Sequence, residues 1–220
     1  MVPINTIKDG QVVDINTGEL YDNIVSICNE HKRTNRALAF AFLLYNCKNP
    51  QINKILEDRH YFQSLHETSG KYLTIFYISQ RETYFGQDLS EHNGKEIRGL
   101  HGLKTGEQLI PHLKPYFELD EKIELPAVLF FQEHNGMMVD YFLLTLDEKK
   151  FEDSFWELQT YIESAVERLE RIKKENYGNS KEIFNQLKSG VTGQRTRIKF
   201  FKLTQTFPIR MFIDRIIEKV

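Results

Sequence analysis

The sequence predicts an α/β fold built on one mixed β-sheet, and three observations lead to this prediction. Residues 37 to 45 are apolar on both faces, which is typical of a central strand buried between layers of helices. Residues 71 to 79 are rich in aromatic and β-branched side chains, which favour strands. Two further apolar runs, 125 to 131 and 137 to 145, are joined through an Asn-Gly pair, which indicates a β-hairpin.

The segments before the second of these strands alternate between extended and helical patterns. Residues 10 to 18 predict a short strand or extended arm, and the apolar spacing over 19 to 33 predicts a helix. For residues 37 to 45 a buried helix competes with the strand, because Ala and Leu favour helices. An Asn-Pro pair begins a second helical stripe over residues 49 to 69, which a glycine ends.

The middle of the chain changes character. Residues 81 to 104 hold four glycines and scattered charges, which predict a long loop. A short helix is expected over 105 to 113. After the hairpin, residues 149 to 174 carry apolar side chains at helical spacing and predict a long amphipathic helix.

The C-terminal part predicts shorter elements. A break at 176 to 180 precedes a short helix that ends at Leu187, and residues 189 to 193 predict a loop. In residues 195 to 203, basic side chains alternate with mostly apolar ones, which predicts a strand. Phe207-Pro208 is expected to begin a last helix.

This order of elements resembles the thioredoxin-like fold. The resemblance is local at Ala37 to Ile78, which is similar to the first strand, active-site helix and second strand of that family, and at Leu125-Pro126, which leads into the hairpin. It implies that Pro126 matches the cis-proline of the family. The chain departs from the family at Cys47-Lys48-Asn49-Pro50, because proline stands where the second cysteine of Cys-x-x-Cys is expected.

The predicted organisation has three parts. Residues 1–33 form an N-terminal arm and helix, and residues 34–175 form the thioredoxin-like core with a loop insertion near 81–104. Residues 176–220 form a C-terminal extension made of a basic strand and an amphipathic helix.

Composition sets broad limits on function. The 220 residues carry a formal net charge of −2, which argues against a protein that coats nucleic acid uniformly. With only two cysteines and no apolar leader, the chain is expected to be a soluble cytoplasmic protein without disulfides. The apolar stretch from 37 to 45 is too short to span a membrane.

Cys47 supports an enzyme hypothesis. A thiol at the start of a helix beside Lys48 has a lowered pKa, so Cys47 opposite Pro126 could form the catalytic pair of a monothiol redox enzyme. The competing interpretation is that Cys47 is a small residue buried at the end of a strand. The seven histidines form no metal-ligand pattern, and no cofactor motif is present, so neither a metal nor a cofactor is expected.

The basic segment from 188 to 202 supports a different hypothesis. On the predicted strand its charges would alternate with apolar side chains and could contact a phosphate backbone. The competing interpretation is an edge strand that its charges protect against aggregation. The candidate nucleic-acid-binding residues are Lys188, Arg195, Arg197, Lys199 and Lys202.

The last predicted helix carries a complete apolar stripe, which must be covered by the core, by a second copy or by a protein partner. A membrane surface is not expected to cover it, because acidic residues dilute its positive face. The residues of the stripe proposed for interaction are Ile209, Phe212, Ile213, Ile216 and Ile217.

These observations favour a non-catalytic protein that serves as a scaffold for protein–protein interaction on a thioredoxin-like core. Its contact surfaces would be the 81–104 loop and the C-terminal extension, which also allows self-association. Two alternatives stay open: a monothiol enzyme that uses Cys47, and a nucleic-acid-binding accessory protein that uses the basic segment.

Overall fold

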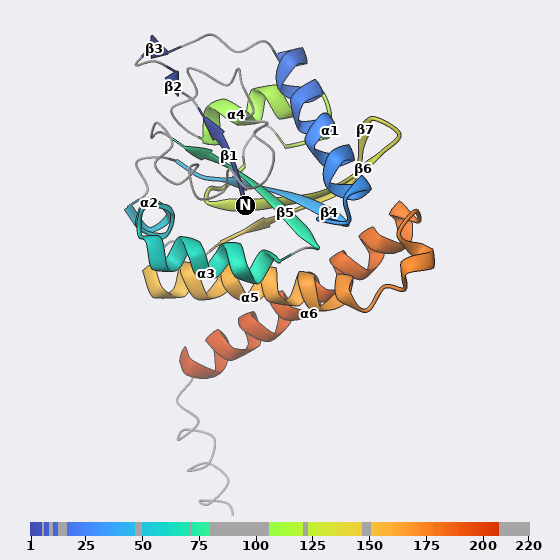
Figure 1. Ribbon diagram of the computed structural model, residues 1–220. Helices are drawn as coiled ribbons and strands as arrows, with labels where there is room; N and C mark the ends of the chain where they lie inside the picture. Colours follow the sequence, from blue (N-terminus) through green and yellow to red (C-terminus); the bar gives the residue numbers. More distant parts are fainter. Residues whose placement is uncertain are drawn as a thin grey trace, which may run out of the picture.

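The structure, a computed structural model, describes residues 1–5, 7–8, 11–12, 17–46, 50–70, 72–79, 106–120, 123–146 and 151–206. In this part of the chain, helices cover both faces of a central sheet (Figure 1). The strands are β1 (Val2–Asn5), β2 (Ile7–Lys8), β3 (Gln11–Val12), β4 (Ala39–Leu44), β5 (Leu73–Ser79), β6 (Ala127–His134) and β7 (Met137–Thr145). The helices are α1 (Thr17–Arg33), α2 (Pro50–Glu57), α3 (Arg59–Ser69), α4 (Gly106–Leu113), α5 (Phe151–Glu170), the 3-10 helix η1 (Lys174–Asn176) and α6 (Ser180–Thr206).

Five strands form one mixed sheet in the order β1-β5-β4-β6-β7. Strands β1 and β4 run parallel to β5 on either side of it, and β6 and β7 extend the sheet in antiparallel pairs. Strands β2 and β3 form a separate antiparallel pair. The predicted α/β class with a mixed sheet is therefore confirmed.

Strand β4 lies at the centre of this sheet, and each of its six residues is buried. The strand predicted over residues 37 to 45 is confirmed, and the competing helix is wrong. Leu and Ala favour helices when isolated, but a strand at this position satisfies its main-chain groups by pairing with β5 and β6.

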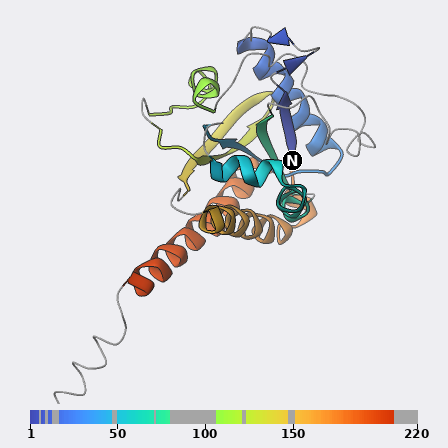
Figure 2. The same ribbon diagram turned by 90° about the vertical axis from the view of Figure 1, so that its left-hand side faces the viewer.

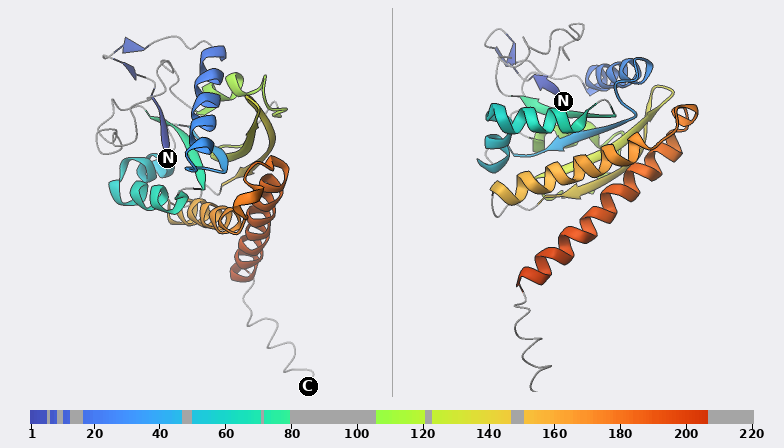
Figure 3. Two further views of the ribbon diagram at one scale, coloured as in Figure 1. Left: turned by 45° about the vertical axis from the view of Figure 1, so that its right-hand side comes forward. Right: turned by 60° about the horizontal axis from the view of Figure 1, so that its bottom comes forward.

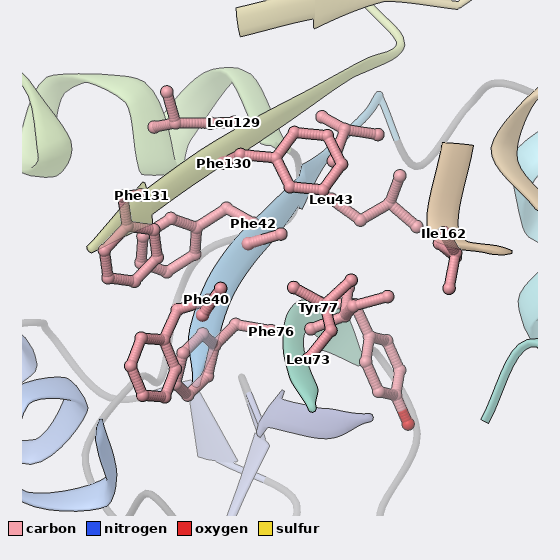
Figure 4. Packing of buried hydrophobic residues seen from close by; sticks show 14 of the residues in the cluster. Phe40, Phe42, Leu43, Leu73, Phe76, Tyr77, Leu129, Phe130, Phe131 and Ile162 are labelled. Atoms are coloured by element: carbon pink, nitrogen blue, oxygen red, sulfur yellow. The ribbon is translucent and has the colours of Figure 1, made fainter. Parts of the chain in front are cut away.

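One face of the sheet carries an aromatic core. Phe40, Phe42, Phe76 and Phe131 lie on this face, and the rings of Phe42 and Phe131 stack with centroids 4.9 Å apart (Figure 4). Helices α1 and α4 cover this face (Figure 1). Such aromatic pairs add roughly 0.5–1.5 kcal/mol each beyond the area that they bury.

The opposite face packs on α3, α5 and α6 (Figures 1 and 2). The Phe62 ring of α3 lies 5.4 Å from Tyr77 of β5, and the Phe184 ring of α6 lies 5.6 Å from Phe142 of β7. Both faces are thus covered by helices, which explains why the central strands show unbroken apolar runs.

The predicted hairpin between β6 and β7 is confirmed. Its turn residues Asn135 and Gly136 have φ values of 52° and 80°, which an Asn-Gly pair adopts readily. The register shifts by one residue between Phe131 and Gln132, where Asp140 on β7 has a φ of 40°. This bulge bends β7 and changes the direction of the half of the hairpin that lies near the turn.

The peptide bond between Leu125 and Pro126 is cis, so the geometry expected at this bond is confirmed. Pro126 is buried and directly precedes β6.

Two N-terminal elements complete the core. Helix α1 agrees with the helix predicted over residues 19 to 33. Strand β1 was not expected from any sequence pattern, because four residues are too few to show a period. It pairs along β5, with Val2 opposite Phe76, so the first residues of the predicted arm belong to the main sheet.

The helical stripe predicted over 49 to 69 is divided into α2 and α3. Asp58 has extended backbone angles between them, and its side chain accepts a hydrogen bond from the His60 N–H at 2.9 Å. This is an N-cap, and it begins a new helix within an apolar pattern that continues across the break.

The C-terminal prediction was wrong in secondary structure. The loop predicted at 189–193 and the strand predicted at 195–203 both lie inside helix α6. Glycines at 190 and 193 indicated a break, but α6 packs along α5, and tertiary packing overrides such local preferences (Figure 3).

Candidate functional site

The sequence places its candidate catalytic site at the edge of the sheet where β4 ends and β6 begins. Leu44 lies opposite Ala127 in the antiparallel register, so Tyr45 and Asn46 leave the sheet beside Pro126. The Pro126 carbonyl accepts a hydrogen bond from the Leu146 N–H at 2.8 Å, which closes the same end of the hairpin.

Tyr45 ties this edge to the neighbouring parallel strand. Its side chain is buried, and its hydroxyl donates a hydrogen bond to the carbonyl oxygen of Ile78 in β5. The backbone that leads toward Cys47 therefore starts from an anchored position.

Cys47, Lys48 and Asn49 lie outside the described residues. Helix α2 begins at Pro50, as the Asn-Pro pattern predicts. The register therefore brings Pro126 to the point where the chain enters the Cys47 segment.

The second cysteine, Cys28, is enclosed in α1. Its side chain is fully buried, and burial raises the pKa of its thiol well above the usual value; the nearby Glu133 carboxylate also raises this pKa, and Lys32 opposes it. Cys28 is therefore held as a neutral thiol, which is a poor nucleophile.

Cys28 lies near the opposite end of β4 from the candidate edge. Glu133, which acts on its pKa, follows Gln132, and the Gln132 side chain donates a hydrogen bond to the Leu38 carbonyl oxygen at 3.1 Å. Leu38 directly precedes β4, whereas Asn46 follows it. Six residues of strand separate these two ends, which corresponds to roughly 20 Å.

A partly buried ion pair that no sequence pattern predicted fixes α1 to the hairpin. The Lys32 Nζ lies 2.9 Å from Oε2 of Glu133, whose side chain is only 1% exposed, and Nζ also donates to the Glu133 carbonyl oxygen. Oε1 of Glu133 accepts a hydrogen bond from the Gly136 N–H at 2.6 Å. A glutamate two residues before an Asn-Gly turn, at the end of an apolar run, was the available signal.

Tyr21 supports the same hairpin from the start of α1. Its hydroxyl donates to the Gly136 carbonyl oxygen at 3.1 Å and accepts from the Met138 N–H at 3.2 Å. The Tyr21 ring stacks on Tyr116 with centroids 4.0 Å apart. These contacts position the hairpin against the start of α1.

The basic residues proposed for nucleic-acid binding lie on a helix. Helical geometry places Arg197 about 200° from Arg195, so the two do not share the face expected of a strand. Lys188, Arg197 and Lys199 are exposed, and Arg195 is half-buried. Lys202 belongs to α6, but its side chain lies outside the described residues.

Other candidate surfaces lie outside the described residues altogether. These are the 81–104 loop and the interaction stripe of Ile209, Phe212, Ile213, Ile216 and Ile217. In the described ranges, no three His, Cys, Asp or Glu side chains converge as a metal site, and no helix is long and apolar enough to cross a bilayer.

Comparison with protein-family models, with characterised proteins and with solved structures finds no match to this chain.

Proposed function

We propose that this protein is a thioredoxin-like interaction module that works without dithiol exchange. The strand order β1-β5-β4-β6-β7, with only β6 antiparallel to its neighbours, supports the thioredoxin-like part of the proposal. The covering of both faces by helices also agrees with it (Figures 1 and 2).

The position of Cys28 carries the functional part. A dithiol cycle needs two sulfurs that approach to about 2 Å. Cys28 is buried near the amino end of β4, whereas Cys47 follows the opposite end of this strand. Cys28 is therefore badly placed to resolve a mixed disulfide on Cys47, which supports a role in binding rather than in dithiol exchange.

The test is the oxidation state of the folded protein. We expect that treatment with diamide does not lower the intact mass of the monomer by two hydrogens, because no internal disulfide forms. In a Cys47→Ser variant, Cys28 should react with a thiol reagent only in denaturant, because its thiol is enclosed. A Cys28–Cys47 disulfide in the folded monomer would contradict the proposal.

The monothiol enzyme is the second candidate, and the register that brings Pro126 beside Tyr45 favours it. A Cys28→Ser variant isolates Cys47, whose pKa can be measured by pH-dependent alkylation. A pKa near or above about 8.5 removes this candidate, whereas a lower value supports it.

A further inference from the structure

Strand β7 forms one end of the main sheet, and no described strand pairs with its outer side. The bulge at Asp140 divides its nine residues, so its regular part is 141–145. An open strand edge presents unpaired N–H and C=O groups and can accept a further strand.

The hydrogen bonds between β6 and β7 show which main-chain N–H and C=O groups of β7 point away from the sheet. The Leu146 N–H donates to Pro126 across the hairpin, and antiparallel pairing alternates between bonded and non-bonded residue pairs. Outward-facing main-chain groups therefore belong to Tyr141, Leu143 and Thr145.

Basic side chains flank this edge on the α6 side of the sheet. Phe184 of α6 contacts Phe142 of β7, and the Nζ of Lys188 lies 6.0 Å from the centre of the Phe184 ring. Gly190 contacts α5, where its carbonyl oxygen accepts from the Ser164 hydroxyl at 3.0 Å. Because Gly190 follows Lys188 by about 200° of helix, Lys188 lies on the side of α6 away from α5.

Helical spacing extends this basic side into a stripe. Lys181 and Arg195 are seven residues before and after Lys188, which places each of them about 20° from Lys188 around the helix and about 40° from each other. From residue 183 to residue 206, α6 contains no acidic residue. We call Lys181, Lys188 and Arg195 the basic stripe.

Acidic side chains flank the other face of the same edge. The Tyr141 hydroxyl donates to the Glu118 carbonyl oxygen at 2.6 Å, and Glu118 and Asp120 are exposed near it. A long polyanion laid along β7 would meet these two carboxylates. A second copy of β7 would bring its own basic stripe against the first one.

We propose that β7 binds an extended peptide segment that carries acidic side chains at alternate positions. Main-chain hydrogen bonds to Tyr141, Leu143 and Thr145 would extend the sheet. Alternate side chains of an added strand point to one face, so its acidic residues would meet the basic stripe, while neutral or basic residues would face Glu118 and Asp120. This inference rests on the proposed interaction-module function and names the class of its partner.

The experiment uses the full chain and a fluorescently labelled ten-residue peptide of alternating Thr and Glu at low salt. We expect saturable binding and slowed amide hydrogen exchange at Tyr141, Leu143 and Thr145. Lys188→Glu should weaken binding by about tenfold, because it places a negative charge beside the acidic peptide. Arg197→Glu makes the same charge change on the other side of α6 and should change the affinity less than about twofold.

A peptide in which Lys replaces Glu should bind Lys188→Glu more tightly than the unaltered chain. Equal effects of the two variants, no binding, or binding without slowed exchange at the three amides would overturn the proposal. So would a dimer that already protects these amides, or a single-stranded DNA 12-mer that binds through Lys188 without protecting them. The thiol measurements test the proposed function separately, since none of these results depends on Cys47.

Discussion

Glu133 shows how a single charged residue can organise the hairpin end of the sheet. Its carboxylate contacts the Lys32 ammonium group through one oxygen and the Gly136 N–H through the other. Burying a charge is costly unless it is paired and hydrogen-bonded, and both conditions hold here.

We expect Glu133→Ala to destabilise the protein by about 2–3 kcal/mol, because it removes the carboxylate that the Gly136 N–H and the Lys32 ammonium group share and leaves Lys32 only the main-chain carbonyl oxygen of residue 133. The loss is smaller than for a fully buried pair because the Lys32 side chain is 25% exposed. Urea unfolding measures it.

Glu167→Ala is the matched control. Glu167 pairs with Arg171 one turn along the chain, and both side chains are more than 60% exposed. Such surface pairs contribute about 0.3–0.5 kcal/mol, so this variant should unfold close to the unaltered chain. Equal losses for the two variants would show that the Glu133 contacts are unimportant.

At the scale of elements, α6 approaches α5 closely at Gly190. A Cβ atom on residue 190 would lie 2.8 Å from the Ser164 carbonyl oxygen and 2.5 Å from Cγ of Arg168. The arginine side chain can move, but the backbone carbonyl of α5 cannot move without separating the helices. A Cβ atom on Gly193, three residues later, would meet open space.

These positions predict opposite effects of the same substitution. Gly190→Ala should destabilise the protein by about 1–2 kcal/mol, since overpacking costs more than the gain in helix propensity. Gly193→Ala should stabilise it by up to about 1 kcal/mol, since it gains the propensity without a clash. Thermal and urea unfolding of both variants check the prediction, which fails if the two shifts have the same sign.

Local sequence patterns could not show that residues 180 to 206 form a single helix. Its glycines and its alternating charges over 195 to 199 are equally compatible with a loop followed by a strand. The helix becomes evident only when Ile183, Leu187, Val191 and Ile198 are seen to be buried together. Their spacings of four, four and seven residues are helical.

At the scale of the whole molecule, the chain start is part of the folded core. In a chain that begins at Met1, the α-amino group is buried and lies 2.7 Å from Nδ1 of His66. Burial lowers the pKa of this amine from 8.0 to about 5. The unfolded chain therefore binds a proton between these pH values that the folded chain does not bind.

This difference predicts a pH-dependent free energy of unfolding. The unfolded state takes up the extra proton. The contribution of this amine to the free energy of unfolding is therefore complete above pH 8 and is lost as the pH falls from 8 toward about 5. The upper limit is about 4 kcal/mol, from about 1.4 kcal/mol per pKa unit.

Urea unfolding across this pH range measures the slope. A Gly-Gly extension ahead of Met1 moves the amine away from its buried position and should flatten this part of the profile. An unchanged slope in the extended chain would assign the pH dependence to other groups.

Much of the architecture could be predicted from local patterns. Strands β4, β5, β6 and β7, helices α1 and α5 and the Asn-Gly turn all follow from periods of two or about 3.6 residues and from turn chemistry. The candidate edge with Pro126 was also predicted. The environment of Cys28 was not, because burial and the approach of Glu133 depend on residues far apart in the sequence.

The class of fold follows from local sequence patterns, since apolar periodicity and an Asn-Gly turn act within a few residues of chain. The pairing of Val2–Asn5 with β5, the contact between Lys32 and Glu133, and the packing of the basic segment as part of a helix on α5 became known only from the three-dimensional structure. Each of these depends on free energy gained by contacts between distant segments. The propensities of a short segment of sequence do not include contacts with distant segments, so they cannot predict these features.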